Sequence, residues 1–217
     1  MRSEMRRILV AAGCILWLAA CGGQKAVETK KAEPAKLEKP PEVYKVKFET
    51  TKGDFLVEVR REWAPRGADH FFNLVQARFY DGARFFRVVR GFVAQFGIAA
   101  SPKVQQFWGS VAIPDDPVRA KNTKGSITFA RLGPNSRRTQ VFINLRDNTA
   151  LDKDGFAPFG RVVEGMDIVE KLYFAYGEIK PRGGGGPDPT QIELQGNAYL
   201  ERQFPRLDAI HRAAVIR

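Results

Sequence analysis

The chain has 217 residues and a formal net charge of +11, from 35 Lys and Arg residues against 24 Asp and Glu residues. Its hydrophobic content of 44% is enough for a domain with a buried core. With only two cysteines, Cys14 and Cys21, a zinc site built from CxxC pairs is excluded.

Residues 1–20 are predicted to be a secretory signal. Three arginines precede an apolar run that ends at Ala20, which is the order of a basic n-region and an h-region. The run is shorter than the roughly 20 apolar residues that a transmembrane helix needs. Residues 18–22 read LAACG and resemble the lipobox of bacterial lipoproteins, so we expect cleavage before Cys21 and lipidation of its side chain. An ordinary signal peptide with a chance cysteine is the alternative.

Residues 21–42 are predicted to be a disordered linker, because they are rich in Lys, Glu and Pro and have almost no apolar side chain to bury. The linker would hold a folded domain away from a membrane to which the lipid attaches it. Cys14 would leave with the signal, so no disulfide is expected despite an oxidising compartment. We therefore expect a cell-envelope protein on the periplasmic or extracytoplasmic face.

Most of the positive charge lies in the mature chain. Residues 1–20 contribute three Arg and one Glu, a net +2, which leaves +9 for the rest of the chain. Nucleic acid is not an expected partner of an exported protein. Attraction to anionic headgroups or acidic client segments and a basic surface that only aids solubility remain two open interpretations.

Residues 43–217 are predicted to form one domain that begins with a β-hairpin. Val43–Glu49 and Phe55–Arg60 alternate apolar and polar residues around a turn. Pro65 opens a helix whose apolar spacing continues to Phe79. A second helix is expected over 164–173. Short strands are expected near 84–88, 92–96, 127–130, 141–144 and 156–162.

The C-terminal third is predicted to contain an insert at about 177–205. A glycine run at 183–186 predicts a flexible break. A helix would then run from its cap at Asp188 to about Phe204, with Gln191 at the capping-box position. A closing strand follows at 208–216. Residues 98–126 show no strong period, and their prolines predict a long ordered loop.

Two segments about 30 residues apart contain the clearest functional signal. Phe85–Gly97 reads FFRVVRGFVAQFG, and Phe129–Ile143 reads FARLGPNSRRTQVFI. In each segment, polar side chains stand among large apolar ones. The polar residues are Arg87 and Gln95 in the first segment and Gln140 in the second. An amide buried without a partner is costly. The pattern therefore predicts an apolar slot with one guanidinium and two amides, which suits a proline ring within a peptide.

Together with a third segment, Leu151–Leu172 (LDKDGFAPFGRVVEGMDIVEKL), these motifs resemble the signatures of the cyclophilin-type peptidyl-prolyl cis-trans isomerases. The resemblance covers roughly Val43 to Tyr173 and is nearest to exported bacterial members. It implies a mainly β fold, a closed antiparallel eight-stranded barrel capped by two helices. In this chain an extra helical insert would precede the last strand.

The resemblance also implies an enzyme that accelerates rotation about X–Pro bonds in exported proteins during folding. Its substrates would be proline-containing segments of unfolded or flexible proteins, and it would act as a monomer without a cofactor or metal. Arg87 would be catalytic, through a hydrogen bond to the proline nitrogen. The substrate-binding residues would be Phe92, Val93, Gln95, Ala130, Arg131, Leu132, Gln140, Phe142, Leu151 and Phe156.

The chain departs from the best-known family pattern at four positions. Val93 replaces a common Met, Arg131 an Asn, and Phe156 a His. Ala150 stands where eukaryotic members often have Trp. The missing Trp predicts weak binding of the cyclic-peptide inhibitor of this family.

Other interpretations remain. The same pocket would suit a binding module or holdase with negligible turnover, and a lipid-anchored solute-binding barrel is a more distant rival. Residues 152–155 read DKDG, as in a calcium loop, but Val163 stands where that loop needs Glu, so a turn is expected. His70 and His211 are isolated, and no metal site is expected. Two interpretations of a further group of arginines are equally open: they form a basic rim of the pocket, or they are ordinary solvated charges. These residues are Arg84, Arg90, Arg137 and Arg138.

Overall fold

The computed structural model describes residues 39–216. The predicted signal, Cys21 and the linker up to residue 38 lie outside the described residues. Residues 39–42 lead into the first strand without regular structure. Within the described part, no helix combines the length and apolar character needed to cross a membrane.

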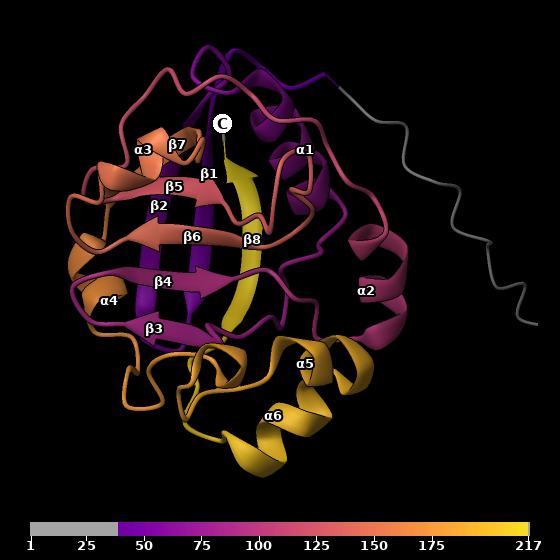
Figure 1. Ribbon diagram of the computed structural model, residues 1–217. Coiled ribbons are helices and arrows are strands. Elements are labelled where there is room, and N and C mark those ends of the chain that lie inside the picture. The colour runs from indigo at the N-terminus through magenta and orange to yellow at the C-terminus, as the bar shows by residue number, and fades with distance from the viewer. Residues whose placement is uncertain (1–38, 217) are drawn as a thin grey trace, which may run out of the picture. The chain divides into compact units, whose positions relative to one another are not determined.

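An eight-stranded antiparallel sheet forms the body of the domain (Figure 1). Its strands are β1 Val43–Thr50, β2 Gly53–Arg60, β3 Arg87–Val89, β4 Val93–Phe96, β5 Ser126–Phe129, β6 Val141–Asn144, β7 Pro158–Glu164 and β8 Ile210–Ile216. They lie in the order β3-β4-β6-β5-β7-β2-β1-β8. The predicted mainly β fold with eight antiparallel strands is confirmed.

The sheet is curled but is not a fully closed barrel, which corrects one part of the prediction. β3 and β8 are its edge strands. The segment before β3 meets the start of β8. Arg84 and Ala209 form an isolated bridge, and the N–H of Ile210 donates to the carbonyl of Ala83 at 2.9 Å. Because β3 has only three residues, the two edges cannot form a continuous ladder.

The β1–β2 hairpin has the predicted two-sided pattern. Thr50 pairs with Gly53 at the turn, and the inward rings of Phe48 and Phe55 stack with centroids 4.8 Å apart. Helix α1, Pro65–Gln76, buries Phe71 and Leu74 in the same core. This burial of large apolar side chains is the main force that stabilises the domain.

Residues 98–126 contain a helix that the sequence did not predict, α2 at Pro102–Gly109. Its proline stands in the first turn, where it is tolerated. Gln105 is its only buried residue, so the helix has no apolar stripe from which to read a period. α1 is also shorter than expected and ends before Phe79.

The remaining helices are α3 Ala150–Lys153, α4 Met166–Glu170, the 3₁₀ turn η1 Lys180–Arg182, α5 Pro189–Gln195 and α6 Asn197–Gln203. α1 and the short α4 correspond to the two predicted helices, and α4 contacts β2. α5 and α6 supply the predicted helical insert before β8 and lie beside the β3 edge of the sheet (Figure 1).

The single helix expected up to Phe204 is wrong, because it breaks at Gly196. This residue has φ 62° and ψ −149°, a conformation that favours glycine. A Cβ here would lie 2.3 Å from the carbonyl oxygen of Ala100. At the helix start, Asp188 caps the N–H of Thr190 at 2.9 Å, while Gln191 bonds Gln195 instead of closing a capping box.

Candidate functional site

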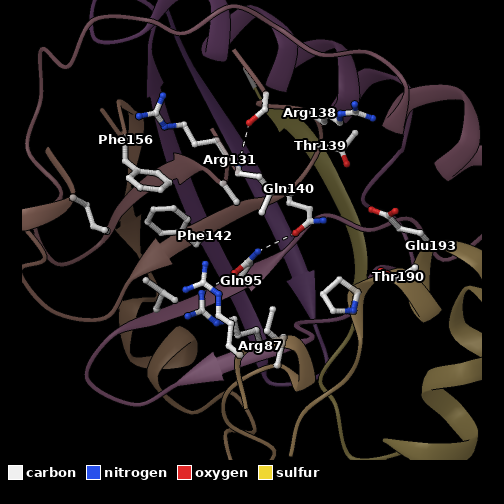
Figure 2. Close-up of a pocket in the computed structure, with 18 of the residues that line it drawn as sticks. Arg87, Gln95, Arg131, Arg138, Thr139, Gln140, Phe142, Phe156, Thr190 and Glu193 are labelled. Atoms are coloured by element: carbon white, nitrogen blue, oxygen red, sulfur yellow. Dashed lines mark hydrogen bonds between the residues drawn. The ribbon is translucent and has the colours of Figure 1, made fainter. Parts of the chain in front are cut away.

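A pocket of about 580 Å³ brings together all eleven residues predicted for catalysis and substrate binding. They are Arg87, Phe92, Val93, Gln95, Ala130, Arg131, Leu132, Gln140, Phe142, Leu151 and Phe156. They come from β3, β4, β6 and α3 and from the loops that follow β5 and precede β4, β6 and β7 (Figure 2). Cys21, the predicted lipidation site, lies outside the described residues.

Strand register places the reactive groups side by side. Arg87 of β3 faces Gln95 of β4, and Gln95 faces Phe142 of β6. Opposed residues of antiparallel strands project to the same face of a sheet. Their neighbours Ala94 and Ile143 project to the other face and join the core.

A chain of hydrogen bonds links the three predicted polar groups. Arg87 Nη1 donates to Gln95 Oε1 at 2.9 Å, and Gln95 Nε2 donates to Gln140 Oε1 at 2.9 Å (Figure 2). Arg87 and Gln95 are buried, and buried polar groups need partners. These hydrogen bonds therefore fix the orientation of both amides and of one edge of the guanidinium.

Aromatic side chains form much of the apolar part of the pocket. The Phe142 and Phe156 rings meet edge to face, with centroids 5.8 Å apart, a favourable arrangement. The guanidinium of Arg87 lies 5.4 Å from the centroid of Phe92. Leu151, a residue of α3, is half-buried and lines the same pocket. The pocket thus offers an apolar floor with a cationic donor at one side.

The segment 130–132 forms another edge of the pocket. The Arg131 side chain turns toward the rim, where it pairs with Asp115 at 2.5 Å and lies 5.4 Å from the centroid of Phe156. Leu132 is fully exposed. Within residues 39–216, the backbone N–H and carbonyl of Arg131 have no hydrogen-bond partner. This backbone is free to pair with an extended peptide.

The insert supplies a wall of the pocket that sequence reasoning missed. Five of its residues line the pocket: Ile179, Arg182, Pro189, Thr190 and Glu193. Glu193 lies near Arg138 and Thr190 (Figure 2). Partial desolvation in the groove raises the pKa of the Glu193 carboxyl, although the charge of Arg138 and the Gln140 amide oppose the shift. Four further lining residues were also missed, Gln105, Ser136, Thr139 and Asp154, and Arg138 was expected only as part of a basic rim.

Glu178, also missed, is the closest partner of the arginine. Its Oε1 accepts from Arg87 Nε and its Oε2 from Arg87 Nη2, both at 2.6 Å. Burial alone would raise the pKa of the Glu178 carboxyl. Hydrogen bonds from Arg87 and the Ile179 N–H, with the charges of Arg87 and Arg182, outweigh burial and lower the pKa. The carboxylate is ionised at neutral pH.

The prediction of a basic rim is wrong for Arg137. Arg137 is 2% exposed and pairs with Asp116 at 3.0 Å. Arg138 does line the pocket. In the DKDG segment, Asp152 accepts hydrogen bonds from Asn122. No group of three or more potential metal-binding side chains gathers within residues 39–216.

Comparison with known proteins agrees with this geometry. A family model described as cyclophilin type peptidyl-prolyl cis-trans isomerase/CLD matches residues 45–180. The chain is 32% identical over 132 residues to a peptidyl-prolyl cis-trans isomerase of Acinetobacter baylyi, covering 58% of this chain and 70% of that one. It is 32% identical over 136 residues to peptidyl-prolyl cis-trans isomerase B of Escherichia coli, with 58% and 82% covered.

A solved structure shows the same fold. It is a cyclophilin type peptidyl-prolyl cis-trans isomerase of Cryptosporidium parvum, with a TM-score of 0.57 and 19% sequence identity. The match covers 81% of this chain and 98% of the other. It therefore extends beyond the residues that the family model matches.

Proposed function

The chain belongs to the cyclophilin-type peptidyl-prolyl cis-trans isomerases, and from this premise we propose that Arg87 catalyses X–Pro rotation in exported proteins as they fold. The family accounts for the reaction and for proline-containing substrates. The role of Arg87 and the exported clients are the proposal. One observation carries it: a guanidinium held by hydrogen bonds beside an apolar pocket.

The energy that catalysis must supply is modest. Resonance sets the barrier to peptide-bond rotation at roughly 18–20 kcal/mol, and an X–Pro bond isomerises in about tens to hundreds of seconds. A turnover of about 10–1,000 per second needs an acceleration of roughly 10³–10⁵, or about 4–7 kcal/mol. A few interactions made only in the twisted state are sufficient.

Arg87 is suited to such an interaction. As the bond twists, the proline nitrogen becomes pyramidal and its lone pair localises. A hydrogen bond to that lone pair exists only in the twisted state and lowers the barrier selectively. Of the five N–H groups of a guanidinium, two donate to Glu178 and one to Gln95. Two remain for the substrate.

The rest of the pocket holds the peptide while the bond rotates. Phe92, Phe142 and Leu151 would enclose the proline ring and exclude water, which strengthens the donor. The free backbone of Arg131 would pair with the residues before proline. One side of the bond is then fixed while the other side turns.

The N-terminus supports an envelope location. The sequence LAACG favours lipidation of Cys21, and the linker up to residue 42 would hold a monomeric domain at the periplasmic or extracytoplasmic face. Labelling with a radioactive fatty acid tests this, because label should enter the parent and not Cys21→Ser. Label in neither protein would leave an ordinary signal peptide.

The catalytic proposal is tested by NMR measurement of cis–trans exchange in an Ala-Pro peptide. Exchange should be fast with the full chain, and Arg87→Ala should reduce it at least about tenfold. Shifts of the peptide signals without acceleration would instead indicate a binding module or holdase.

A further inference from the structure

The insert contacts the reactive arginine directly. Arg87 and Glu178 are 91 residues apart, yet they form two parallel hydrogen bonds of 2.6 Å. Such a bidentate pair of charges is the strongest geometry available to arginine. The Arg87 side chain is 7% exposed and that of Glu178 is 29% exposed. The contact is thus a shielded ion pair at the edge of the pocket.

Glu178 is itself held in place by the loop that follows it. Its Oε1 accepts the N–H of Ile179, and its carbonyl accepts the N–H of Gly186, both at 2.9 Å. A Cβ at Gly184 would lie 1.9 Å from the Glu178 carbonyl oxygen. Within the glycine run expected to be a flexible break, Gly184 and Gly186 thus form a close-packed loop against this glutamate.

The insert is also anchored to the barrel beside Arg87. Phe86, the residue before Arg87, lies in a buried cluster with Ile192 and Leu200 of the insert. Ile98, which follows β4, belongs to the same cluster. Tyr176 and Ile179, on either side of Glu178, pack against this cluster, and dense packing holds the glutamate rigidly.

We propose that Glu178 is a positioning residue that holds the Arg87 guanidinium in its productive orientation; the inference rests on the proposed catalytic role of Arg87. Glu178 and Gln95 together occupy three N–H groups of Arg87. The side chain therefore loses its rotational freedom before the substrate arrives, which is the advantage of preorganised sites. Glu178 does not line the pocket and does not compete with the peptide.

The negative charge of the carboxylate also partly neutralises the guanidinium. This would weaken Arg87 as a hydrogen-bond donor, so it opposes the benefit of positioning. Positioning outweighs it because the twisted X–Pro bond develops a localised lone pair and no net charge. A correctly directed donor matters more there than the total charge of the group. The substitution Glu178→Gln, which keeps the shape but can accept only one of the two bonds, should therefore slow turnover.

The test is a double-mutant cycle on the full chain, with kcat and KM measured separately by NMR exchange. Glu178→Gln should lower kcat about threefold to tenfold and leave KM nearly unchanged. In an Arg87→Ala background the same change should have no further effect, because Glu178 acts through Arg87. Glu201→Gln is the matched control, since Glu201 is an insert glutamate paired with a different arginine, Arg84, at 3.7 Å. It should keep parental kcat.

A spectroscopic measurement separates positioning from general stabilisation. The Nε–H signal of Arg87, identified by its loss in Arg87→Lys, should exchange slowly with water in the parent and rapidly in Glu178→Gln. Parental or higher kcat in Glu178→Gln, while Arg87→Ala is impaired, would overturn the inference and leave the proposed function standing. An equal loss from Glu178→Gln in both backgrounds would also overturn it. Full activity in Arg87→Ala would overturn the proposed function itself.

Discussion

Gln95 lies directly opposite Arg87 in the β3–β4 pair and uses its two amide atoms in different directions. Its oxygen accepts from Arg87 and its nitrogen donates to Gln140, each at 2.9 Å. The amide thus couples the reactive arginine to the groove. A side chain of the same size without polar atoms would break both bonds at once.

We predict that Gln95→Leu lowers kcat/KM about tenfold and the free energy of unfolding by about 1–3 kcal/mol, because the buried Arg87 and the half-buried Gln140 each lose a partner. Peptide exchange and urea denaturation measure the two effects. Gln191→Leu is the control, since Gln191 bonds only Gln195 on the insert surface. A Gln95 variant with parental activity would show that the hydrogen-bond chain does not orient Arg87.

Arg87→Lys should lose nearly as much activity as Arg87→Ala, at least about tenfold in kcat/KM. An ammonium keeps the charge, but it cannot form the parallel bonds to Glu178 and the bond to Gln95 while still donating to a substrate. Circular dichroism should show an intact fold. If lysine restored most of the activity, positive charge alone would be the important property.

His70 should make the domain less stable in mild acid. Burial lowers its pKa to about 4, with help from the charge of Arg137. A histidine in the unfolded chain has a pKa near 6.5, so the unfolded state binds more protons below that pH. The free energy of unfolding is therefore unaffected by this histidine above about pH 6.5, and it falls by about 2–3 kcal/mol on going to pH 4.5.

Urea denaturation at pH 7.5 and 4.5 measures this effect. His70→Phe fits between Trp108 and Phe129, the rings that His70 contacts, and should remove that part of the pH dependence. The same change in stability between the two pH values in parent and variant would exclude His70 as its source.

Two neighbouring glycines of the insert offer a matched pair. Gly184→Ala would place a Cβ against the Glu178 carbonyl, whereas a Cβ at Gly185 meets no atom within 4 Å. We predict that Gly184→Ala lowers both turnover and stability, the latter by about 1–3 kcal/mol. Gly185→Ala should be neutral or slightly stabilising. Equal behaviour of the two variants in peptide exchange and thermal unfolding would contradict the close-packed loop.

The cyclic-peptide inhibitor of the family should bind weakly. Ala150 is exposed at the start of α3 and does not line the pocket, so no large apolar wall stands there. Ala150→Trp should improve inhibitor affinity about tenfold in calorimetry by adding apolar contact area. Lys153→Trp, on the same short helix, is the control. Stoichiometric inhibition of the parent would contradict the prediction.

Local patterns allowed the sequence to predict what depends on near neighbours. Alternation in Val43–Glu49 located the first hairpin, and the three motif segments contain every predicted residue of the pocket. The missed features depend on distant contacts. Gly196 breaks a helix because of Ala100, and nothing near Glu178 in the sequence indicates that its partner is Arg87. α2 was missed because its only buried residue is polar.

The place of β1 in the sheet determines when the domain can be completed. β1 lies between β2 and β8, and its residue Lys45 pairs with Ile216. During synthesis β2 therefore follows β1 almost at once, whereas β8 is made some 150 residues after β2. Until β8 arrives, β1 has an unpaired edge that invites pairing with other chains. This member of the peptidyl-prolyl isomerase family thus has a slow, long-range step in its own assembly.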